Sequence, residues 1–176
     1  DWKTVKPEPT EKERIENCEK VYEMMPKRPP LKHGGDRAFY APGPDYVQMP
    51  KLEDFRKQPF YYSTLFHELI HSTGHAKRVK RDLNATFGDK KYAYEELIAE
   101  IGASYICAYT GILFHTRKNS AAYLKGWMRG LVVEAQQNKT FFFKAASQAQ
   151  QAANYILSKQ LADSKKAKKK TSKKGL

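Results

Sequence analysis

The sequence predicts an α+β fold, a mostly helical domain with one small antiparallel β-hairpin. The chain has 176 residues, of which 40% are hydrophobic, so it is long enough for one domain with a substantial core. Apolar residues recur at helical spacing in several segments, whereas one pair of short runs is rich in aromatic and β-branched residues. Several helices with a single strand pair favour α+β over an alternating α/β architecture.

The first expected elements are a linker end, a helix and the hairpin. Residues 1–9 are polar, contain prolines and begin without Met, so we interpret them as the end of a linker that follows an upstream segment. Thr10 is the expected N-cap of a helix that ends at the run PKRPP. Two short runs, 38–40 and 46–48, flank a turn rich in Pro, Gly and Asp, which predicts the hairpin.

Four further helices are expected after the hairpin, with a charged surface loop over 75–91. Their predicted ranges are 59–72, 92–109, 119–136 and 140–161. The residues that end or cap them are Gly74, Gly111, Asn119 or Ser120, and Thr140. The folded domain is therefore expected to span 10–162. Residues 163–176 form a Lys-rich tail that cannot bury a core and is expected to be disordered.

The charge of the chain is strongly positive and unevenly spread. Lys and Arg exceed Asp and Glu by 32 − 19 = 13. From residue 164 onward the tail has no acidic residue and seven lysines: Lys165, Lys166, Lys168, Lys169, Lys170, Lys173 and Lys174. Such a tail is expected either to bind the DNA phosphate backbone without sequence preference or to serve solubility alone. A DNA mimic is disfavoured, because a mimic must be acidic and this chain has a net charge of +13.

Membrane insertion and disulfide bonding are not expected. The chain has no apolar run long enough to span a membrane and no apolar signal-peptide core at its start. Cys18 and Cys107 lie far apart within expected helices, where they suit buried small side chains. A reducing cytoplasm fits this cysteine usage best.

The sharpest motif is the HExxH pattern of His67, Glu68 and His71, within the expected helix 59–72. Residues four apart lie on one helix face, so both imidazoles can reach one zinc ion at about 2.0–2.1 Å. Glu68 is turned by about 100° from His67, so it flanks the metal and can act as a general base. The alternative is a pair of ordinary histidines, but on so apolar a helix they would be costly without a partner.

A catalytic zinc ion needs a third protein ligand and an open position for water. Glu96 is the preferred candidate, because it lies in a second apolar helix and shares a face with Glu100. One carboxylate can then bind zinc while the other, Glu100, orients a ligating imidazole. Glu95 points about 100° away from Glu96 and is disfavoured as a ligand. His75 lies past the end of its helix and is disfavoured as well.

Several blocks of sequence occur in an order that resembles a known family: HGGDRAFYAPGPDYVQMP, FHELIHSTGH, FGDKKYAYEELIAEIGA and FFFKAASQAQQAANYIL. Over roughly residues 11–161 the chain is similar to the C-terminal zincin-like metallopeptidase domain of ArdC-type antirestriction proteins, which plasmids and other mobile elements carry. The resemblance implies a gluzincin-type site with one Zn²⁺ per chain, Glu96 as third ligand, and a small sheet over the active-site helix. It also implies a bacterial protein with an additional N-terminal domain that binds single-stranded DNA.

These observations predict a zinc metallopeptidase that hydrolyses peptide bonds, with DNA-associated proteins as candidate substrates. Glu68 would move a proton from water to the leaving amine. The oxyanion needs a hydrogen-bond donor, and the sequence does not choose among Tyr92, Tyr94, His75 and Arg78. The alternative is a catalytically silent zinc-containing module that opposes restriction by binding DNA or a restriction enzyme. A metal-dependent nuclease fits less well, because such sites favour carboxylate-rich Mg²⁺ ligation.

Overall fold

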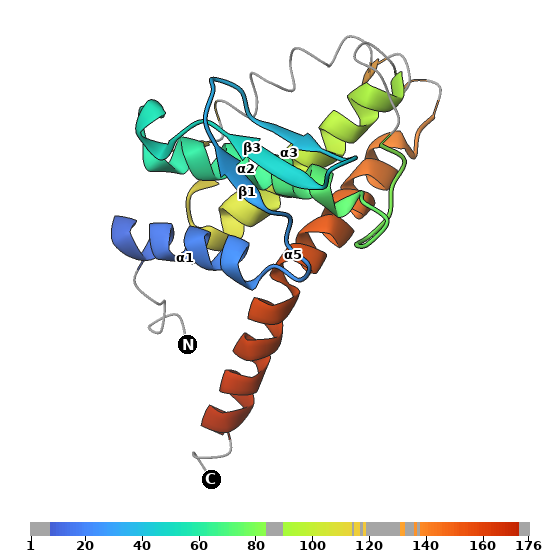
Figure 1. Ribbon diagram of the computed structural model, residues 1–176. Coiled ribbons are helices and arrows are strands. Elements are labelled where there is room, and N and C mark those ends of the chain that lie inside the picture. Colours follow the sequence, from blue (N-terminus) through green and yellow to red (C-terminus); the bar gives the residue numbers. More distant parts are fainter. Residues whose placement is uncertain are drawn as a thin grey trace.

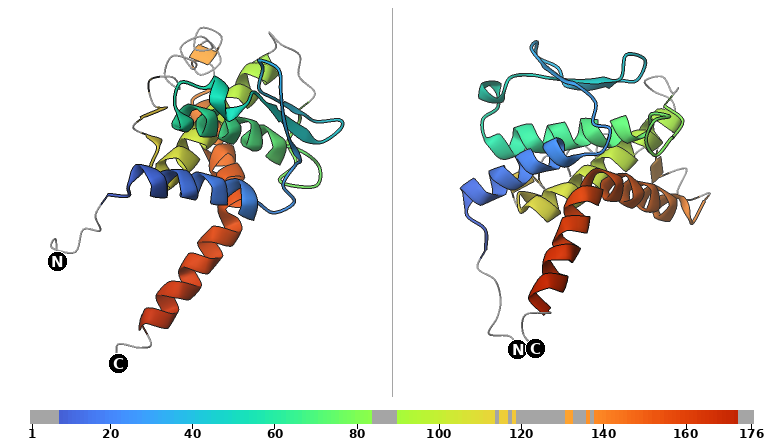
Figure 2. Two further views of the ribbon diagram at one scale, coloured as in Figure 1. Left: turned by 60° about the vertical axis from the view of Figure 1, so that its left-hand side comes forward. Right: turned by 60° about the horizontal axis from the view of Figure 1, so that its bottom comes forward.

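The computed structural model describes residues 8–83, 90–113, 115–116, 118, 131–132, 136 and 138–172, with side chains up to residue 164. Its elements are α1 (Glu11–Met24), β1 (Leu31–His33), β2 (Phe39–Ala41), β3 (Tyr46–Met49), the short 3-10 helix η2 (Leu52–Asp54), α2 (Gln58–Thr73), α3 (Lys90–Thr110) and α5 (Phe141–Ser172). The sheet lies over one side of α2, and α1, α3 and α5 lie on the other side of this helix (Figure 1, Figure 2). The predicted α+β class is confirmed.

The sheet is mixed, with the strand order β1-β3-β2. The predicted hairpin is present, because β2 pairs with β3 in antiparallel fashion and Tyr40 lies opposite Val47. β1, which the sequence did not predict, pairs in parallel with the other side of β3 and places Leu31 opposite Val47. The expectation of a purely antiparallel sheet was therefore wrong. β1 has three residues and no β-branched side chain, so it forms through its pairing with β3 and not through local preference.

The sequence predicted α1, α2 and α3 nearly to their ends. Thr10 caps α1: its hydroxyl accepts from the backbone N–H of Glu13, and the Glu13 side chain accepts from the Thr10 N–H. α2 carries Pro59 in its first turn and ends at Gly74. α3 is followed by Gly111, whose φ of 86° lies in the left-handed region that favours glycine. The helix expected over 119–136 lies almost entirely outside the described residues.

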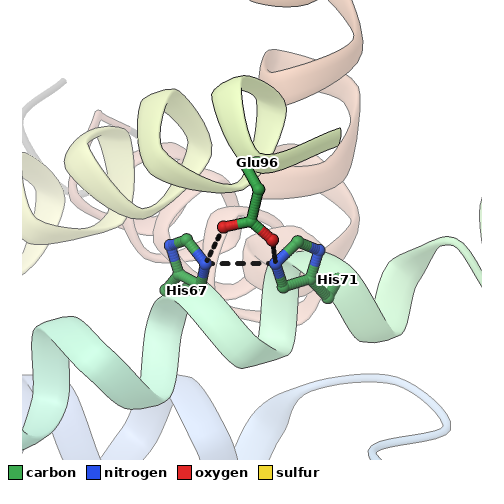
Figure 3. A group of neighbouring side chains, drawn as sticks. All are labelled: His67, His71 and Glu96. Carbon is green, nitrogen blue, oxygen red and sulfur yellow. Dashed lines mark hydrogen bonds and ion pairs between the residues drawn. The ribbon is translucent and has the colours of Figure 1, made fainter. Parts of the chain in front are cut away.

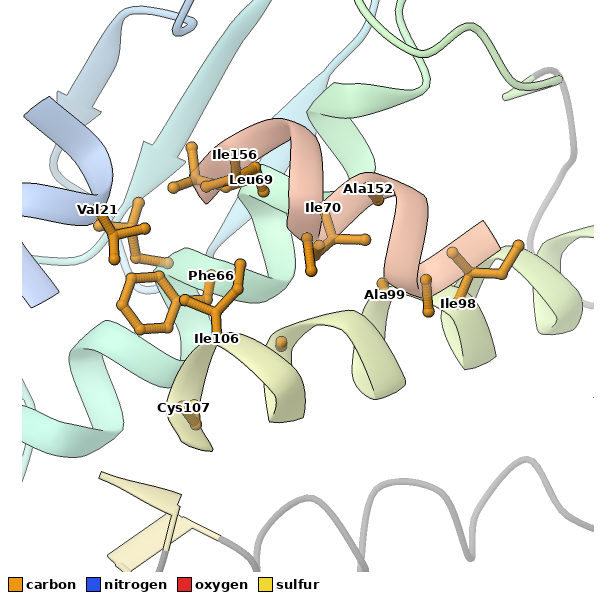
Figure 4. Packing of buried hydrophobic residues seen from close by; sticks show 14 of the residues in the cluster. Val21, Phe66, Leu69, Ile70, Ile98, Ala99, Ile106, Cys107, Ala152 and Ile156 are labelled. Atoms are coloured by element: carbon orange, nitrogen blue, oxygen red, sulfur yellow. The ribbon is translucent and has the colours of Figure 1, made fainter. Parts of the chain in front are cut away.

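The core lies where α2 meets α3 and α5 (Figure 4). Phe66, Leu69 and Ile70 of α2 are fully buried there. They belong to one cluster with apolar side chains of α3 and α5, which include Ile98, Ile106 and Ile156. Gly102 lets α3 approach α2 closely, because a Cβ atom at this position would lie 2.6 Å from Ile70 Cδ1. This close crossing brings the carboxylates of α3 to the histidines of α2.

The last helix, α5, is longer than predicted. It runs from Phe141 to Ser172, past the expected end at residue 161 and into the segment that was expected to be disordered. Its final turns project away from the other elements (Figure 1, Figure 2). Ala and Lys have high helix propensity, so an established helix propagates into this segment at little cost. The side chains of the seven tail lysines lie outside the described residues.

None of the helices in the described ranges combines the length and the apolar character that a membrane span requires.

Candidate metal centre

His67 and His71 lie one turn apart on α2 and face Glu96 of α3 (Figure 3). The Nε2 atoms of the two imidazoles are 3.1 Å apart. The Glu96 carboxylate straddles them, with Oε2 3.4 Å from His67 Nε2 and Oε1 3.3 Å from His71 Nε2. The three residues that the sequence singled out as metal ligands therefore converge, although they come from two helices.

The spacing of these donor atoms fits a tetrahedral metal ion. Two ligands of a tetrahedral zinc ion, each bound at about 2.0–2.1 Å, lie about 3.4 Å from one another. Each Nδ1 faces a carboxylate, so an imidazole that binds a metal ion would keep its proton on Nδ1 and direct its Nε2 lone pair toward Glu96. Two imidazole nitrogens and a carboxylate that converge in this way can hold one metal ion.

A second carboxylate of α3 stands behind each histidine. Glu100 Oε2 lies 3.2 Å from His67 Nδ1, in the orienting position that the sequence suggested for Glu100. Glu95 Oε1 lies 3.2 Å from His71 Nδ1. Glu95 is outside the group of three possible ligands, and its contact with His71 was not expected from helical periodicity. That contact depends on how α3 crosses α2, which no pattern within α3 reveals.

Buried acidic side chains make the site strongly anionic. Glu68, Glu95, Glu96 and Glu100 are all at most 9% exposed. Burial lowers the pKa of His67, but hydrogen bonds to Glu100 and Glu96 outweigh burial and raise this pKa to about 10. Burial raises the pKa of Glu96, but hydrogen bonds to the two imidazoles hold it well below its usual range. The site therefore favours positive charge, which a metal ion would supply.

Arg81 is a buried cation that the sequence analysis did not single out. Its side chain is 7% exposed. Its Nη2 and Nε atoms donate to Oε1 and Oε2 of Glu95, at 2.6 and 2.9 Å. The guanidinium also donates to Thr73 Oγ1 and to the Ile70 carbonyl, near the end of α2. No motif marks Arg81, because the segment 75–91 has the charged composition of a surface loop.

Glu68 lies where two clefts meet. One cleft, of about 430 Å³, is lined by His67, Glu68, His71 and Glu96. A second cleft, of about 530 Å³, is also lined by His67 and Glu68, and both clefts reach Ala38, the residue just before β2. The Glu68 carboxylate is therefore placed to contact water or substrate beside the two histidines.

Tyr92 and Tyr94, two of the residues expected to stabilise an oxyanion, lie in different places. Tyr92 lines the cleft that contains His67 and Glu96. Burial and the neighbouring Glu96 carboxylate raise the pKa of Tyr92 to about 12, so its hydroxyl stays protonated at neutral pH. Tyr94 packs against Phe141 of α5, with ring centroids 5.0 Å apart, and lines a separate, lysine-rich cleft.

His75 and Arg78, the other two residues named for that role, hold the turn after α2. His75 Nδ1 accepts from the backbone N–H of Lys77 at 3.1 Å. Arg78 donates to Asp45 Oδ1 at 2.8 Å and to the Ser72 carbonyl at 3.0 Å, and its side chain is 1% exposed. The structure therefore places His75 and Arg78 outside the metal cleft, as it does Tyr94.

The chain is similar to several known proteins. The profile of the zincin-like metallopeptidase family MPTase-PolyVal matches residues 20–148. Crystal structures of the antirestriction protein ArdC from plasmid R388, one Mn(II)-bound and one metal-free, cover 86% and 87% of this chain at 35% and 36% identity, with TM-scores of 0.62 and 0.60.

Two curated sequences are also similar. The uncharacterized protein y4eC of Sinorhizobium fredii is 36% identical over 85% of this chain. A DNA primase TraC of Escherichia coli is 41% identical over 70% of this chain. The chain spans 53% and 50% of the two ArdC chains, 47% of y4eC and 8% of TraC. The similarity therefore concerns the domain that carries the metal centre and not the whole of these proteins.

Proposed function

The chain belongs to the zincin-like metallopeptidase family, and from this premise we propose that it is a zinc-dependent peptidase domain of an antirestriction or mobile-element protein. The observation that carries the proposal is the convergence of His67, His71 and Glu96, with Glu68 beside them where two clefts meet. This arrangement combines three ligands for one ion with a separate base. A structural zinc site is usually closed by four protein ligands and needs no base.

The donor set favours zinc as the ion, with one Zn²⁺ per chain. Two imidazoles and one carboxylate are a common ligand set of catalytic zinc. Sites of this kind generally bind Zn²⁺ more tightly than Mn²⁺. The ArdC protein of plasmid R388 has been crystallised with Mn(II), so the metal preference of this chain requires its own measurement. Metal content of the purified protein and the rise in melting temperature with added zinc both provide it.

Each residue around the site has its own role in the proposed reaction. A bound ion supplies the Lewis acidity that activates water and polarises the scissile carbonyl. Glu68 accepts the proton of the attacking water and donates it to the leaving amine. Tyr92 lines the same cleft with its hydroxyl protonated, so it can donate a hydrogen bond to the oxyanion. Glu95 and Glu100 hold the two imidazoles in orientation.

An extended peptide is the substrate shape that the clefts favour. β2 is an edge strand of the described sheet, and its residues Phe39 and Tyr40 line the metal cleft. A peptide that adds to this edge would pair its backbone with β2 and pass over Glu68. The adjoining cleft contains Phe55 and Phe60, which offer apolar surface to a substrate side chain.

The proposal extends to proteins that are associated with DNA in a bacterial cytoplasm. It is supported by the net charge of +13, by the lysine tail, and by the similarity to parts of an antirestriction protein and a DNA primase. Lysine contacts with phosphates release counterions, so DNA binding by the tail should weaken steeply with salt. A single-stranded-DNA-binding domain upstream, which the family resemblance implies, would add affinity.

The deciding experiment compares the wild type with Glu68→Gln on casein and on DNA-bound proteins, with and without a chelator. We expect chelator-sensitive cleavage by the wild type, and a rate about 10²–10⁴-fold lower for the variant, which should retain its zinc. Equal rates would remove Glu68 from the mechanism. A zinc-loaded wild type that cleaves nothing would favour the silent module, which opposes restriction by binding DNA or a restriction enzyme.

A further inference from the structure

We propose that Arg81 is a positioning residue of the metal centre, which holds Glu95 so that Glu95 holds the ring of His71. The inference deepens the proposed function, because it rests on His71 as a metal ligand. It does not follow from the HExxH motif, since Arg81 belongs to the loop after α2 and contacts neither a proposed ligand nor Glu68 in the contacts described.

A continuous series of short contacts joins Arg81 to His71. Arg81 Nη2 donates to Glu95 Oε1 at 2.6 Å, and the same oxygen lies 3.2 Å from His71 Nδ1. Arg81 Nε donates to the other Glu95 oxygen at 2.9 Å, so both ends of the carboxylate are held. A carboxylate in such a bidentate pair has little freedom to rotate. Its oxygen therefore sets the plane of the imidazole and keeps the Nδ1 proton in place.

Arg81 is itself fixed to α2, the helix that carries both histidines. Nη1 donates to Thr73 Oγ1 at 2.6 Å, and Nη2 donates to the Ile70 carbonyl at 2.8 Å. The Arg81 backbone N–H donates to the Gly74 carbonyl at 2.8 Å, and the preceding residue, Lys80, has a left-handed backbone with a φ of 63°. The guanidinium thus connects the end of α2 to Glu95 of α3, and the metal ligands come from the same two helices.

Arg78 provides a matched control from the same loop. It is as deeply buried, and it also donates to a carbonyl at the end of α2, that of Ser72. Its carboxylate partner is Asp45, which lies in the turn between β2 and β3 and is not among the metal-binding residues. Loss of either arginine should destabilise the fold, but only loss of Arg81 should affect the metal.

The test measures zinc affinity, by competition with a chromogenic chelator, for Arg81→Met, Arg81→Lys and Arg78→Met. We expect about 10–100-fold weaker binding for Arg81→Met, the size typical of lost support behind a ligand. Arg81→Lys should fall between this variant and the wild type, because lysine keeps the charge but not the bidentate geometry. Arg78→Met should lower the melting temperature of the metal-free protein and leave zinc affinity unchanged. If Arg81→Met does not fold, the comparison of Arg81→Lys with Arg78→Met decides.

A double-mutant cycle with Glu95→Gln separates action through Glu95 from general destabilisation. If Arg81 acts through Glu95, Arg81→Met should weaken zinc binding little further in the Glu95→Gln background. Nitrogen-15 spectra of the His71 ring should also show one Nδ1–H tautomer in the wild type and a mixture in Arg81→Met. Additive losses, or equal zinc loss in Arg78→Met, would overturn the inference. A wild-type protein that binds no zinc would instead contradict the proposed function.

Discussion

The carboxylates that lie behind His67 and His71 differ in their surroundings. Each ring faces a carboxylate of α3 across 3.2 Å. Behind His71, Glu95 is held at both oxygens by the buried Arg81. Behind His67, Glu100 lines the cleft of about 530 Å³ that also contains Ser63 and Thr64 of α2. Both carboxylates border a cleft, and Glu95 in addition forms a buried ion pair with Arg81.

We expect His67, His71 and Glu96 to bind one metal ion together. We expect His71→Ala and Glu96→Ala to lose the metal, because two donors hold an ion poorly against water. The loss of affinity should exceed the roughly 10–100-fold expected for a supporting residue. Mass spectrometry of the native proteins measures metal content, and Glu95→Ala is the control that should keep one ion at saturating zinc. A Glu96→Ala variant that binds zinc like the wild type would show that Glu96 is not a ligand.

Neutralising the supporting carboxylates should separate the two sides. Glu95→Gln and Glu100→Gln should each weaken zinc binding about 10–100-fold. Glu95→Gln should also destabilise the metal-free protein by about 3 kcal/mol, because it removes the charge partner of buried Arg81. Thermal unfolding of the metal-free variants tests this expectation. Equal melting temperatures for the two variants would mean that the two sides are supported alike.

Gly102 lies where α3 crosses α2, the two helices that supply the three proposed metal ligands. Ala favours a helix over Gly by about 1 kcal/mol, so the substitution would stabilise an exposed helix. At this position the new Cβ would lie 2.6 Å from Ile70 Cδ1. Since overpacking costs about 1–3 kcal/mol, we expect Gly102→Ala to destabilise the protein by up to about 2 kcal/mol and to weaken zinc binding.

Denaturant unfolding with and without zinc measures both effects of Gly102→Ala. Gly43→Ala is the control, because a Cβ there has no atom within 4 Å, and its stability should equal that of the wild type. A Gly102→Ala variant more stable than the wild type would show that α2 and α3 separate without cost.

The final turns of α5 project away from the other elements (Figure 1), so removal of the lysine tail should have the smallest effect on the centre. Deletion of the residues after Asp163 leaves the buried α5 residues Ala152 and Ile156 in place. We expect an unchanged melting temperature and zinc affinity, but weaker, less salt-dependent retention on immobilised DNA. Retention equal to that of the full chain would place DNA binding elsewhere.

Much of the helical framework could be predicted from the sequence, because helix periodicity and end signals are local. The N-cap Thr10 and Gly111, the glycine after α3, are examples. The parallel strand β1 could not be predicted, because Leu31–His33 acquires its conformation from β3, which lies later in the chain. The length of α5 was underestimated because a Lys-rich composition suggests disorder when its continuity with a packed helix is not considered.

The sequence by itself determined which residues could share a helix face, so His67 and His71 were recognisable as a pair and Glu96 and Glu100 as another. Only the tertiary structure decided that α3 crosses α2 so that Glu95 contacts His71. It also decided that Arg81, in the charged loop after α2, donates to Glu95. The physical reason is that side-chain direction within a helix follows from its 3.6-residue period. Contacts between helices depend instead on close packing at positions such as Gly102 and on loop geometry, to which residues far apart in the chain contribute.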